Sequence, residues 1–185
     1  MAGIHQLWAF DPLTQTVSVL AGTTNEGLVD GECASAWFAQ TSGLAVDAGG
    51  TVWLADSETS SLRRITNGVV TSEVGRGLFD FGHRDGAADE ALLQHPLGVA
   101  VLPDGSIAVA DTYNGAIRRF DPATRQMTTI ATGLAEPSDI AVIADPERDF
   151  VLLVVESAAH RLTFVPLPKE ATVIGGIAYR TQRPL

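Results

Sequence analysis

Short runs of apolar residues, separated by turn residues, recur along the whole chain. The clearest example, residues 97–120, predicts three strands: Gly98–Leu102, Ser106–Ala110 and Ala116–Phe120. The first two strands are joined by Pro-Asp-Gly at 103–105, a turn sequence in which proline fixes φ and glycine supplies a positive φ. The second and third are joined by a polar loop that ends in Asn-Gly, which is typical of a tight reversal between strands.

The same three-strand unit appears again when the sequence is shifted by 55 residues. This shift places Thr51–Asp56 on Ser106–Asp111, and Ser61–Ile65 on Ala116–Phe120, without a gap. A further copy follows at a shift of 45 residues, where Val151–Glu156 falls on the second strand of the unit. A repeat of this length indicates that similar structural units are stacked along the chain.

Each copy contains four predicted strands, here called A to D in chain order. They are Gly43–Asp47, Thr51–Ala55, Ser61–Thr66 and Gly68–Gly75; Gly98–Leu102, Ser106–Ala110, Ala116–Phe120 and Gln126–Ala131; and Asp139–Ile143, Phe150–Val155, Arg161–Leu167 and Ala171–Ala178. Four short antiparallel strands per repeat are typical of β-propeller blades. Strand B is apolar on both faces, so both faces need a covering layer, which neighbouring blades provide. We therefore predict an all-β fold, a β-propeller of four-stranded blades; a β-sandwich is the competing architecture, but it does not predict the gap-free shift.

The phase of the repeat predicts the domain organisation. Met1 aligns with Asp56 and Asp111, so the first unit begins at the end of its strand B. We expect a partial propeller over residues 1–168, followed by a last strand and a C-terminal tail or linker over 169–185. Its parts are a blade remnant at 1–22 and blades at about 42–75, 97–132 and 138–178. About three and a half blades cannot close a ring, so the sequence predicts a longer propeller protein, a truncated gene model, or self-association through exposed blade edges.

The charge balance changes which partners are expected. The chain has 22 acidic and 12 basic residues, a net charge of −10 and a pI near 4.6. Such a surface repels phosphate, so we expect neither nucleic acid nor an anionic membrane as a partner. With 45% hydrophobic and 18% charged residues, the composition is that of a folded chain.

The cysteine content, the length of the apolar runs and the N-terminal sequence indicate the cellular compartment of the protein. Cys33 is the single cysteine, which excludes an intrachain disulfide and a Cys-x-x-Cys motif. No apolar run has the length of a membrane helix, and the N-terminus lacks the pattern of a signal peptide, so we predict a cytoplasmic protein. The predominance of Arg over Lys, with abundant Ala and Gly, suggests a bacterial source.

Residues 110–120, ADTYNGAIRRF, resemble the NHL repeat, in which an Asp ends strand B and Asn-His-Arg opens strand C. Asn114, both His5 and His160, and Arg161 match single positions of that pattern, and no copy matches all of them. The inserts at 22–42 and 77–97 share Gly-x-x-Asp-Gly followed by an Ala-rich turn and two large apolar residues. They are similar to those of the NHL-repeat propellers that follow a thioredoxin-like domain. The resemblance implies a six-bladed propeller in the intact protein, with this chain as its C-terminal part.

One side of the predicted propeller carries the candidate binding residues. Strand alternation places the inserts between strand D and the next strand A on the same side as the loops between strands B and C. Rigid scaffolds often bind through such loops. The candidate partner-binding face consists of Asp30, Trp37, Glu58, His83, Asp85, Tyr113, Asn114 and His160. The alternative is that the inserts only cap the blades.

Two recurring sets of charged residues each allow a structural and a functional interpretation. Asp56, Asp111 and Glu156 end successive B strands, where they could ring a cation or could accept backbone N–H bonds that fix each loop. Their recurrence favours the structural role. The pairs at 63–64 and 118–119, all arginine, could form a stripe for anions; we expect instead ion pairs on a solvated edge near the rim.

No catalytic, cofactor-binding or metal-binding residue is predicted from motifs. The two Asp-Gly pairs at 30–31 and 85–86 lack the spacing of a calcium loop, and the four histidines lack zinc-site spacing. Neither a Gly-x-Ser-x-Gly elbow nor a phosphate loop occurs. Cys33 lacks the partners of a nucleophile, and we expect no cofactor.

The sequence therefore favours a non-catalytic binding or scaffold module of a larger, thioredoxin-linked protein. It would present its B–C loops and D–A inserts to a protein or small-molecule partner. The alternative is a propeller enzyme of the lactonase or lyase type, with a channel metal held partly by blades outside this chain. Near the starts of the A strands, Asp139 and Glu136 are the candidate ligands for such a metal. A non-functional gene fragment is a third hypothesis.

Overall fold

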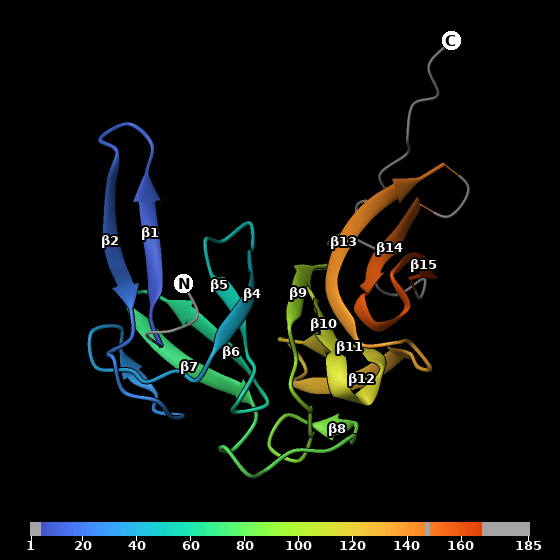
Figure 1. Cartoon of the computed structure of the whole chain (residues 1–185), viewed down its shortest axis with the longest axis horizontal. Coiled ribbons are helices and arrows are strands. Elements are labelled where there is room, and N and C mark those ends of the chain that lie inside the picture. Colours follow the sequence, from blue (N-terminus) through green and yellow to red (C-terminus); the bar gives the residue numbers. More distant parts are fainter. Residues whose placement is uncertain (1–4, 147–148, 168–185) are drawn as a thin grey trace.

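The computed structural model describes residues 5–146 and 149–167, and this part of the chain folds into four antiparallel sheets (Figure 1). The first is the hairpin β1 (Leu7–Asp11) and β2 (Thr16–Ala21). The second contains β3 (Gly31–Glu32), β4 (Thr41–Val46), β5 (Val52–Asp56), β6 (Ser61–Thr66) and β7 (Val69–Val74). The third contains β8 (Gly86–Ala87), β9 (Gly98–Val101), β10 (Ile107–Asp111), β11 (Ala116–Asp121) and β12 (Gln126–Ala131). The fourth contains β13 (Pro137–Asp145), β14 (Asp149–Glu156) and β15 (Arg161–Pro166).

The predicted strands are present in the described residues, with ends that differ by one to two residues in most cases. Strands β6 and β12 match their predicted bounds. The predicted strand over 171–178 lies outside the described residues. Short 3-10 turns, η1 (Thr112–Asn114) and η2 (Ser157–Ala159), follow β10 and β14 and were not predicted.

The two middle sheets have five strands each, one more than the sequence predicts. Their orders are β3-β7-β6-β5-β4 and β8-β12-β11-β10-β9, so strands A to D run in sequence across each blade. The fifth strand comes from the insert that precedes the blade: β3 pairs with β7, and β8 pairs with β12. Each insert therefore covers the otherwise unpaired edge of strand D. Two-residue strands leave no hydrophobic alternation, which is why the sequence pattern did not show them.

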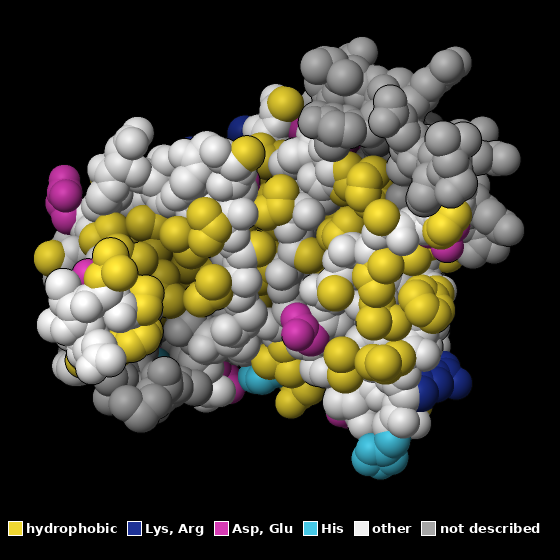
Figure 2. Space-filling model, turned by 90° about the horizontal axis from the view of Figure 1, so that it is seen from above, with side chains coloured by type: hydrophobic (Ala, Val, Ile, Leu, Met, Phe, Trp, Pro, Cys, Tyr) yellow, Lys and Arg dark blue, Asp and Glu magenta, His cyan; other side chains and the backbone are white. Residues whose placement is uncertain are grey.

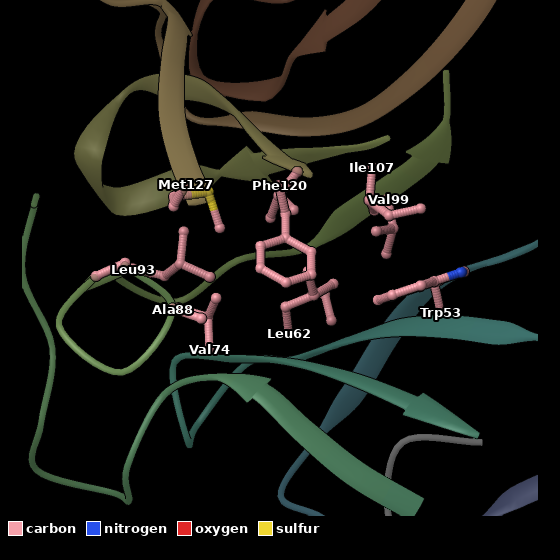
Figure 3. Packing of buried hydrophobic residues seen from close by; sticks show 12 residues of the cluster. Trp53, Leu62, Val74, Ala88, Leu93, Val99, Ile107, Phe120 and Met127 are labelled. Atoms are coloured by element: carbon pink, nitrogen blue, oxygen red, sulfur yellow. The ribbon is translucent and has the colours of Figure 1, made fainter. Parts of the chain in front are cut away.

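Alternating residues of strand B pack against different neighbouring blades, as the apolar pattern predicts. Trp53 lies in one cluster with Ile107 and Phe120 of the next blade, whereas Leu54 lies in another with Ala21 of the preceding hairpin. Figure 3 shows the first cluster, in which side chains from β5 and β6 meet those of β9, β10 and β11. The rings of Trp53 and Phe120 lie 6.1 Å apart at 56°. This interdigitated packing stacks the blades.

Adjacent A strands approach one another so closely that glycine is required. Strands β4, β9 and β13 lie side by side, and the N–H of Gly43 donates to the carbonyl of Leu97 at 2.6 Å. A Cβ on Gly98 would lie 2.7 Å from the Cα of Asp139 and 3.0 Å from the carbonyl oxygen of Ser138. Both obstacles are backbone atoms, which cannot move away as a flexible side chain can.

The two end sheets each carry apolar side chains on their outward surface (Figure 2). On the β1–β2 hairpin, these exposed residues are Trp8, Phe10, Val17 and Val19. On the fourth sheet they are Val155, Leu162 and Phe164. The equivalent surfaces of the middle blades are buried between blades, so the end surfaces are suited to the same kind of packing.

Loops of the same type emerge on the same side of the sheets. In Figure 1 the β1–β2 and β4–β5 turns lie at the top, whereas the insert strand β8 lies at the foot of the molecule. We call the side that carries the D–A inserts and the B–C loops the insert face.

The close approach of the A strands predicts that a single methyl group added to β9 strongly lowers the stability of the protein. Gly98→Ala should lower the free energy of unfolding by about 1–3 kcal/mol, because the new Cβ overlaps the backbone of β13. Gly49→Ala is the matched control, since the nearest atom to its Cβ is a carboxylate oxygen of Asp47 at 3.3 Å. Urea unfolding of both variants measures the difference. Equal stability of the two variants would contradict the proposed close approach.

Candidate functional site

A buried arginine fastens the first insert to its blade. Arg63 projects from β6 with a side chain that is 0% exposed. Its Nη1 donates to Asp56 Oδ2 at 3.0 Å and to the carbonyl of Trp37 at 3.1 Å. Its Nη2 donates to Asp30 Oδ1 at 3.0 Å and to the carbonyl of Val29 at 3.2 Å. One guanidinium thus joins the end of strand B to both arms of the insert.

The next blade repeats this arrangement atom for atom. Arg118 Nη1 donates to Asp111 Oδ2 at 2.7 Å and to the carbonyl of Leu92 at 3.0 Å. Its Nη2 donates to Asp85 Oδ1 at 2.6 Å and to the carbonyl of Arg84 at 2.8 Å. We call each such guanidinium, with its two carboxylates, an arginine bridge. Because it recurs in two blades, the repeat itself specifies the position of each insert.

The insert carboxylates also bind the outer strand of the blade. Asp30 accepts hydrogen bonds from the backbone N–H and the hydroxyl of Ser72 on β7. Asp85 accepts the same pair from Thr129 on β12. Partial burial raises the pKa of Asp85, but hydrogen bonds from Arg118 and Thr129 outweigh burial and hold this pKa below its ordinary value. Asp85 therefore carries its charge at neutral pH.

The acidic residues at the ends of the B strands have the geometry expected of the structural interpretation. Asp56, Asp111 and Glu156 accept the backbone N–H groups of Ala39, Gln94 and Ala135, each at 2.7 Å. Every one of them thereby fixes the connection that leads into its own strand A.

The pKa values of these acids follow from their different surroundings. Burial raises the pKa of Asp56 to about 6, against the charge of Arg63 and the N–H of Ala39. Hydrogen bonds from Arg161, Thr163 and the N–H of Ala135 lower the pKa of Glu156 to about 2. Burial likewise raises the pKa of Asp111, against hydrogen bonds from Asn114, Gln94 and Arg118. With these pKa values, Asp56 and Glu156 are mainly ionised at pH 7.

The ion pairs predicted for the arginine pairs are present, but the predicted solvated location is wrong for one member of each pair. Arg63 and Arg118 are buried rather than at a solvated rim, because strand alternation turns them toward the insert, where two carboxylates and two carbonyls accept their N–H groups. The following arginines behave as predicted: Arg64 pairs with Glu73 at 2.9 Å and Arg119 with Asp104 at 2.7 Å.

Between the two middle blades, the insert face contains a small hollow with aromatic walls. Four segments contribute to it: the B–C loop at 58–60, the start of the insert at 78–81, the end of the insert at 94–95, and η1. Its lining residues are Glu58, Ser60, Leu78, Phe81, Gln94, His95 and Tyr113. We call this feature the aromatic hollow.

Local contacts hold His95 and Tyr113, which line the aromatic hollow, in place. The rings of His95 and Tyr113 stack with their centroids 4.5 Å apart and 10° between their planes. The N–H of Tyr113 donates to the carbonyl of Gln94 at 3.2 Å, and the N–H of His95 donates to Ser60 Oγ at 3.2 Å. Tyr113 is nevertheless 60% exposed, and Phe81 is 52% exposed. The ring of Tyr113 is therefore oriented and accessible at the same time.

The structure divides the predicted face into residues that fasten loops and residues that line the hollow. Glu58 and Tyr113 line it, whereas Asp30 and Asp85 belong to the arginine bridges. Asn114 donates to Asp111 and to the carbonyl of Gly82, so it also fastens a loop.

The other predicted residues lie apart from the hollow. His83 is exposed beside Thr129, with 3.3 Å between Nε2 and Oγ1, and His160 is exposed at the end of η2. Trp37 is half-buried, and its carbonyl accepts a bond from Arg63.

Five of the lining residues were not predicted from the sequence: Ser60, Leu78, Phe81, Gln94 and His95. The available signal was the run Leu-Phe-Asp-Phe at 78–81, where three large apolar residues follow a glycine at the start of the insert.

The part of the chain that the structure describes contains neither a candidate metal cluster nor a candidate membrane helix. Across residues 5–146 and 149–167, no group of three or more His, Cys, Asp or Glu side chains is placed to hold a metal ion. Asp139 Oδ1 accepts the N–H of Ile140, and the carbonyl of Glu136 accepts the N–H and hydroxyl of Ser157. In the same part of the chain, no helix has the length and apolarity to cross a bilayer.

The arginine bridge predicts that substitutions of two arginines in neighbouring blades lower the free energy of unfolding by very different amounts. Arg118→Met should lower the free energy of unfolding by about 3–5 kcal/mol, because it leaves Asp111 buried without its cation. Arg64→Met is the control and should cost less than about 1 kcal/mol, since Arg64 is partly exposed and Arg125 still pairs with Glu73. Thermal and urea unfolding measure both. If Arg118→Met were as mild as the control, the bridge would not hold the insert.

Comparisons with known proteins fit this geometry. A model of the NHL repeat matches residues 93–120, which include the end of the second insert, β9, β10 and all but the last residue of β11. The protein SUPPRESSOR OF QUENCHING 1, chloroplastic, of Arabidopsis thaliana is 38% identical over 146 residues, which cover 73% of this chain and 14% of that protein. NHL repeat-containing protein 2 of Homo sapiens is 35% identical over 173 residues, or 81% of this chain and 24% of that protein. The chain thus spans less than two thirds of either relative.

A solved structure supports the architecture. The virginiamycin B lyase from Staphylococcus aureus superposes with a TM-score of 0.56 at 14% identity, over 92% of this chain and 52% of that chain. At this identity the likeness concerns the fold alone. Together with the repeat match and the two relatives, it leads to one conclusion: this chain belongs to the NHL-repeat family of β-propeller proteins.

Proposed function

We propose that this chain is a non-catalytic binding module, and that a protein partner docks on its insert face. The single observation that carries the proposal is the aromatic hollow, where Tyr113 and Phe81 are exposed and the ring of Tyr113 is held by its stack with His95. Exposed tyrosine and phenylalanine side chains that cluster on a surface are typical of interface centres.

The rigidity of the insert supports this role. The arginine bridge of the third sheet fastens the insert at Asp85, and Asn114 fastens Gly82 one residue after Phe81. Binding to a surface that is already ordered loses little conformational entropy, so more of the contact energy becomes affinity. The neighbouring Phe79, which is 90% exposed, extends the apolar area beyond the hollow.

We further propose that the module acts within a longer, thioredoxin-linked protein. Its inserts resemble those of the NHL-repeat propellers that follow a thioredoxin-like domain, and its relatives are several times longer than this chain. The propeller would then place a bound partner near the redox domain of that protein.

The proposed docking face predicts where a photo-crosslinker captures a partner. p-Benzoylphenylalanine at position 113 should capture a defined protein from an extract of the source organism, whereas the same group at position 13 should not. Leu13 is the control because it is 93% exposed in the β1–β2 turn, on the opposite side of the molecule.

The captured protein is then identified by mass spectrometry, purified and titrated into the chain by calorimetry. Phe81→Ser should weaken its binding by roughly 10-fold or more, the loss of one interface anchor. Equal capture at positions 13 and 113, or unchanged affinity of Phe81→Ser, would refute docking at this face.

A further inference from the structure

The aromatic hollow combines exposed rings with a carboxylate that lacks a partner. Glu58 lies at the B–C loop of the second sheet, and its backbone N–H donates to the carbonyl of Ala39 at 3.1 Å. Within the described residues, no hydrogen bond or ion pair reaches its carboxylate, although the residue is half-buried. The other acids of these two loop systems, Asp56 and Asp111, are fully engaged by arginine. Glu58 thus differs from them in being free to bind a ligand.

The walls of the hollow define the shape of that ligand. Tyr113 presents an exposed aromatic face that the stack with His95 holds in one orientation. Leu78 and Phe81, at the start of the insert, supply the apolar part of the lining. A group that fits this site needs an apolar stem that packs against Leu78 and Phe81. It also needs a flat polar head that stacks on Tyr113 and contacts the carboxylate of Glu58.

The charge of the chain and of the lining residues determines whether the polar head of the ligand is a cation or an anion. The chain carries a net charge of −10, and the polar groups of the lining include one carboxylate and no lysine or arginine. A cation over an aromatic face is attracted by the ring, and more strongly where water is partly excluded. Arginine satisfies all of these conditions, because its guanidinium is planar, stacks on aromatic rings and donates two parallel hydrogen bonds to a carboxylate.

We propose that the aromatic hollow binds an arginine side chain in an exposed segment of a protein partner. The guanidinium stacks on Tyr113 and donates to the carboxylate of Glu58, and its methylene stem packs against Leu78 and Phe81. This inference rests on the proposed function, since it names the chemistry that the docking face recognises. It differs from the arginine bridges, which use arginines of the chain itself.

The test uses the whole chain and three short peptides that differ at one position. The peptides are acetyl-Gly-Ser-X-Ser-Gly-amide, with X as arginine, citrulline or lysine, and binding is followed by two-dimensional 1H–15N NMR. The arginine peptide should shift the amide signals of Glu58, His95 and Tyr113 in a saturable manner. Citrulline, which has the same shape without the charge, should bind roughly 10-fold more weakly. Lysine, which has the charge without the planar fork, should also bind more weakly.

Variants of the chain test the contributions of the Glu58 carboxylate and the Tyr113 ring separately. Glu58→Gln should weaken arginine-peptide binding by about 10-fold, whereas Glu26→Gln, which removes one exposed charge from the other insert, should leave it unchanged. Tyr113→Phe should retain binding and Tyr113→Leu should lose most of it, because only the first keeps an aromatic face. Signals of β10 and β11 in the same spectra confirm that each variant is folded.

The outcomes distinguish this inference from the broader proposal. If citrulline or lysine peptides bind as well as the arginine peptide, or if Glu58→Gln has no effect, arginine recognition is wrong. If none of the peptides binds the hollow while the crosslinker at position 113 still captures a partner, the inference fails and the proposed function stands. If position 113 captures nothing and arginine peptides do not bind, both fail.

Discussion

A buried positive charge that two carboxylates share determines the shape of this protein's loop surface. Arg63 and Arg118 each lie between an acid at the end of strand B and an acid in the preceding insert, and they also donate to two insert carbonyls. Burying a guanidinium costs less free energy when its N–H groups find acceptors. The insert follows the path that supplies acceptors to both Nη groups of each arginine, while the Nε of Arg63 and of Arg118 has no hydrogen-bond partner among the described residues. The bridge thereby converts a loop of some 20 residues at 77–97 into a fixed part of the blade. The aromatic hollow depends on it, because Leu78, Phe81 and His95 all belong to that insert.

The bridges act on a framework that hydrophobic packing builds. Strand B is apolar on both faces and each face meets a different blade, so successive sheets stack as Trp53, Ile107 and Phe120 interdigitate. Glycine at positions 43 and 98 lets the inner strands approach more closely than a Cβ would permit. Hydrophobic packing thus determines the distance between blades, and the arginine bridges determine the position of the inserts between them. The hollow forms where both meet, at the junction of the second and third sheets.

Much of this arrangement follows from the sequence, and the exceptions have physical reasons. The strands and the propeller fold were predictable because the repeat holds over 55 residues and strand B is continuously apolar. The roles of Arg63 and Arg118 were not, because two adjacent arginines point to opposite faces and the partner acids Asp30 and Asp85 lie 33 residues away. The hollow was partly predicted through Glu58 and Tyr113. Its other walls come from separate segments, and no local pattern shows that these segments meet.

An arginine bridge holds the insert that carries the aromatic hollow. Hydrogen exchange of the variant Asp85→Ala tests this role, since the Asp85 side chain is 46% exposed and its removal should leave the apolar clusters between the blades in place. Amides of residues 77–97, including Leu92, which donates to Arg84, should exchange roughly 10-fold faster, whereas residues 22–42 should be unchanged. Unaltered protection of residues 77–97 would contradict the account.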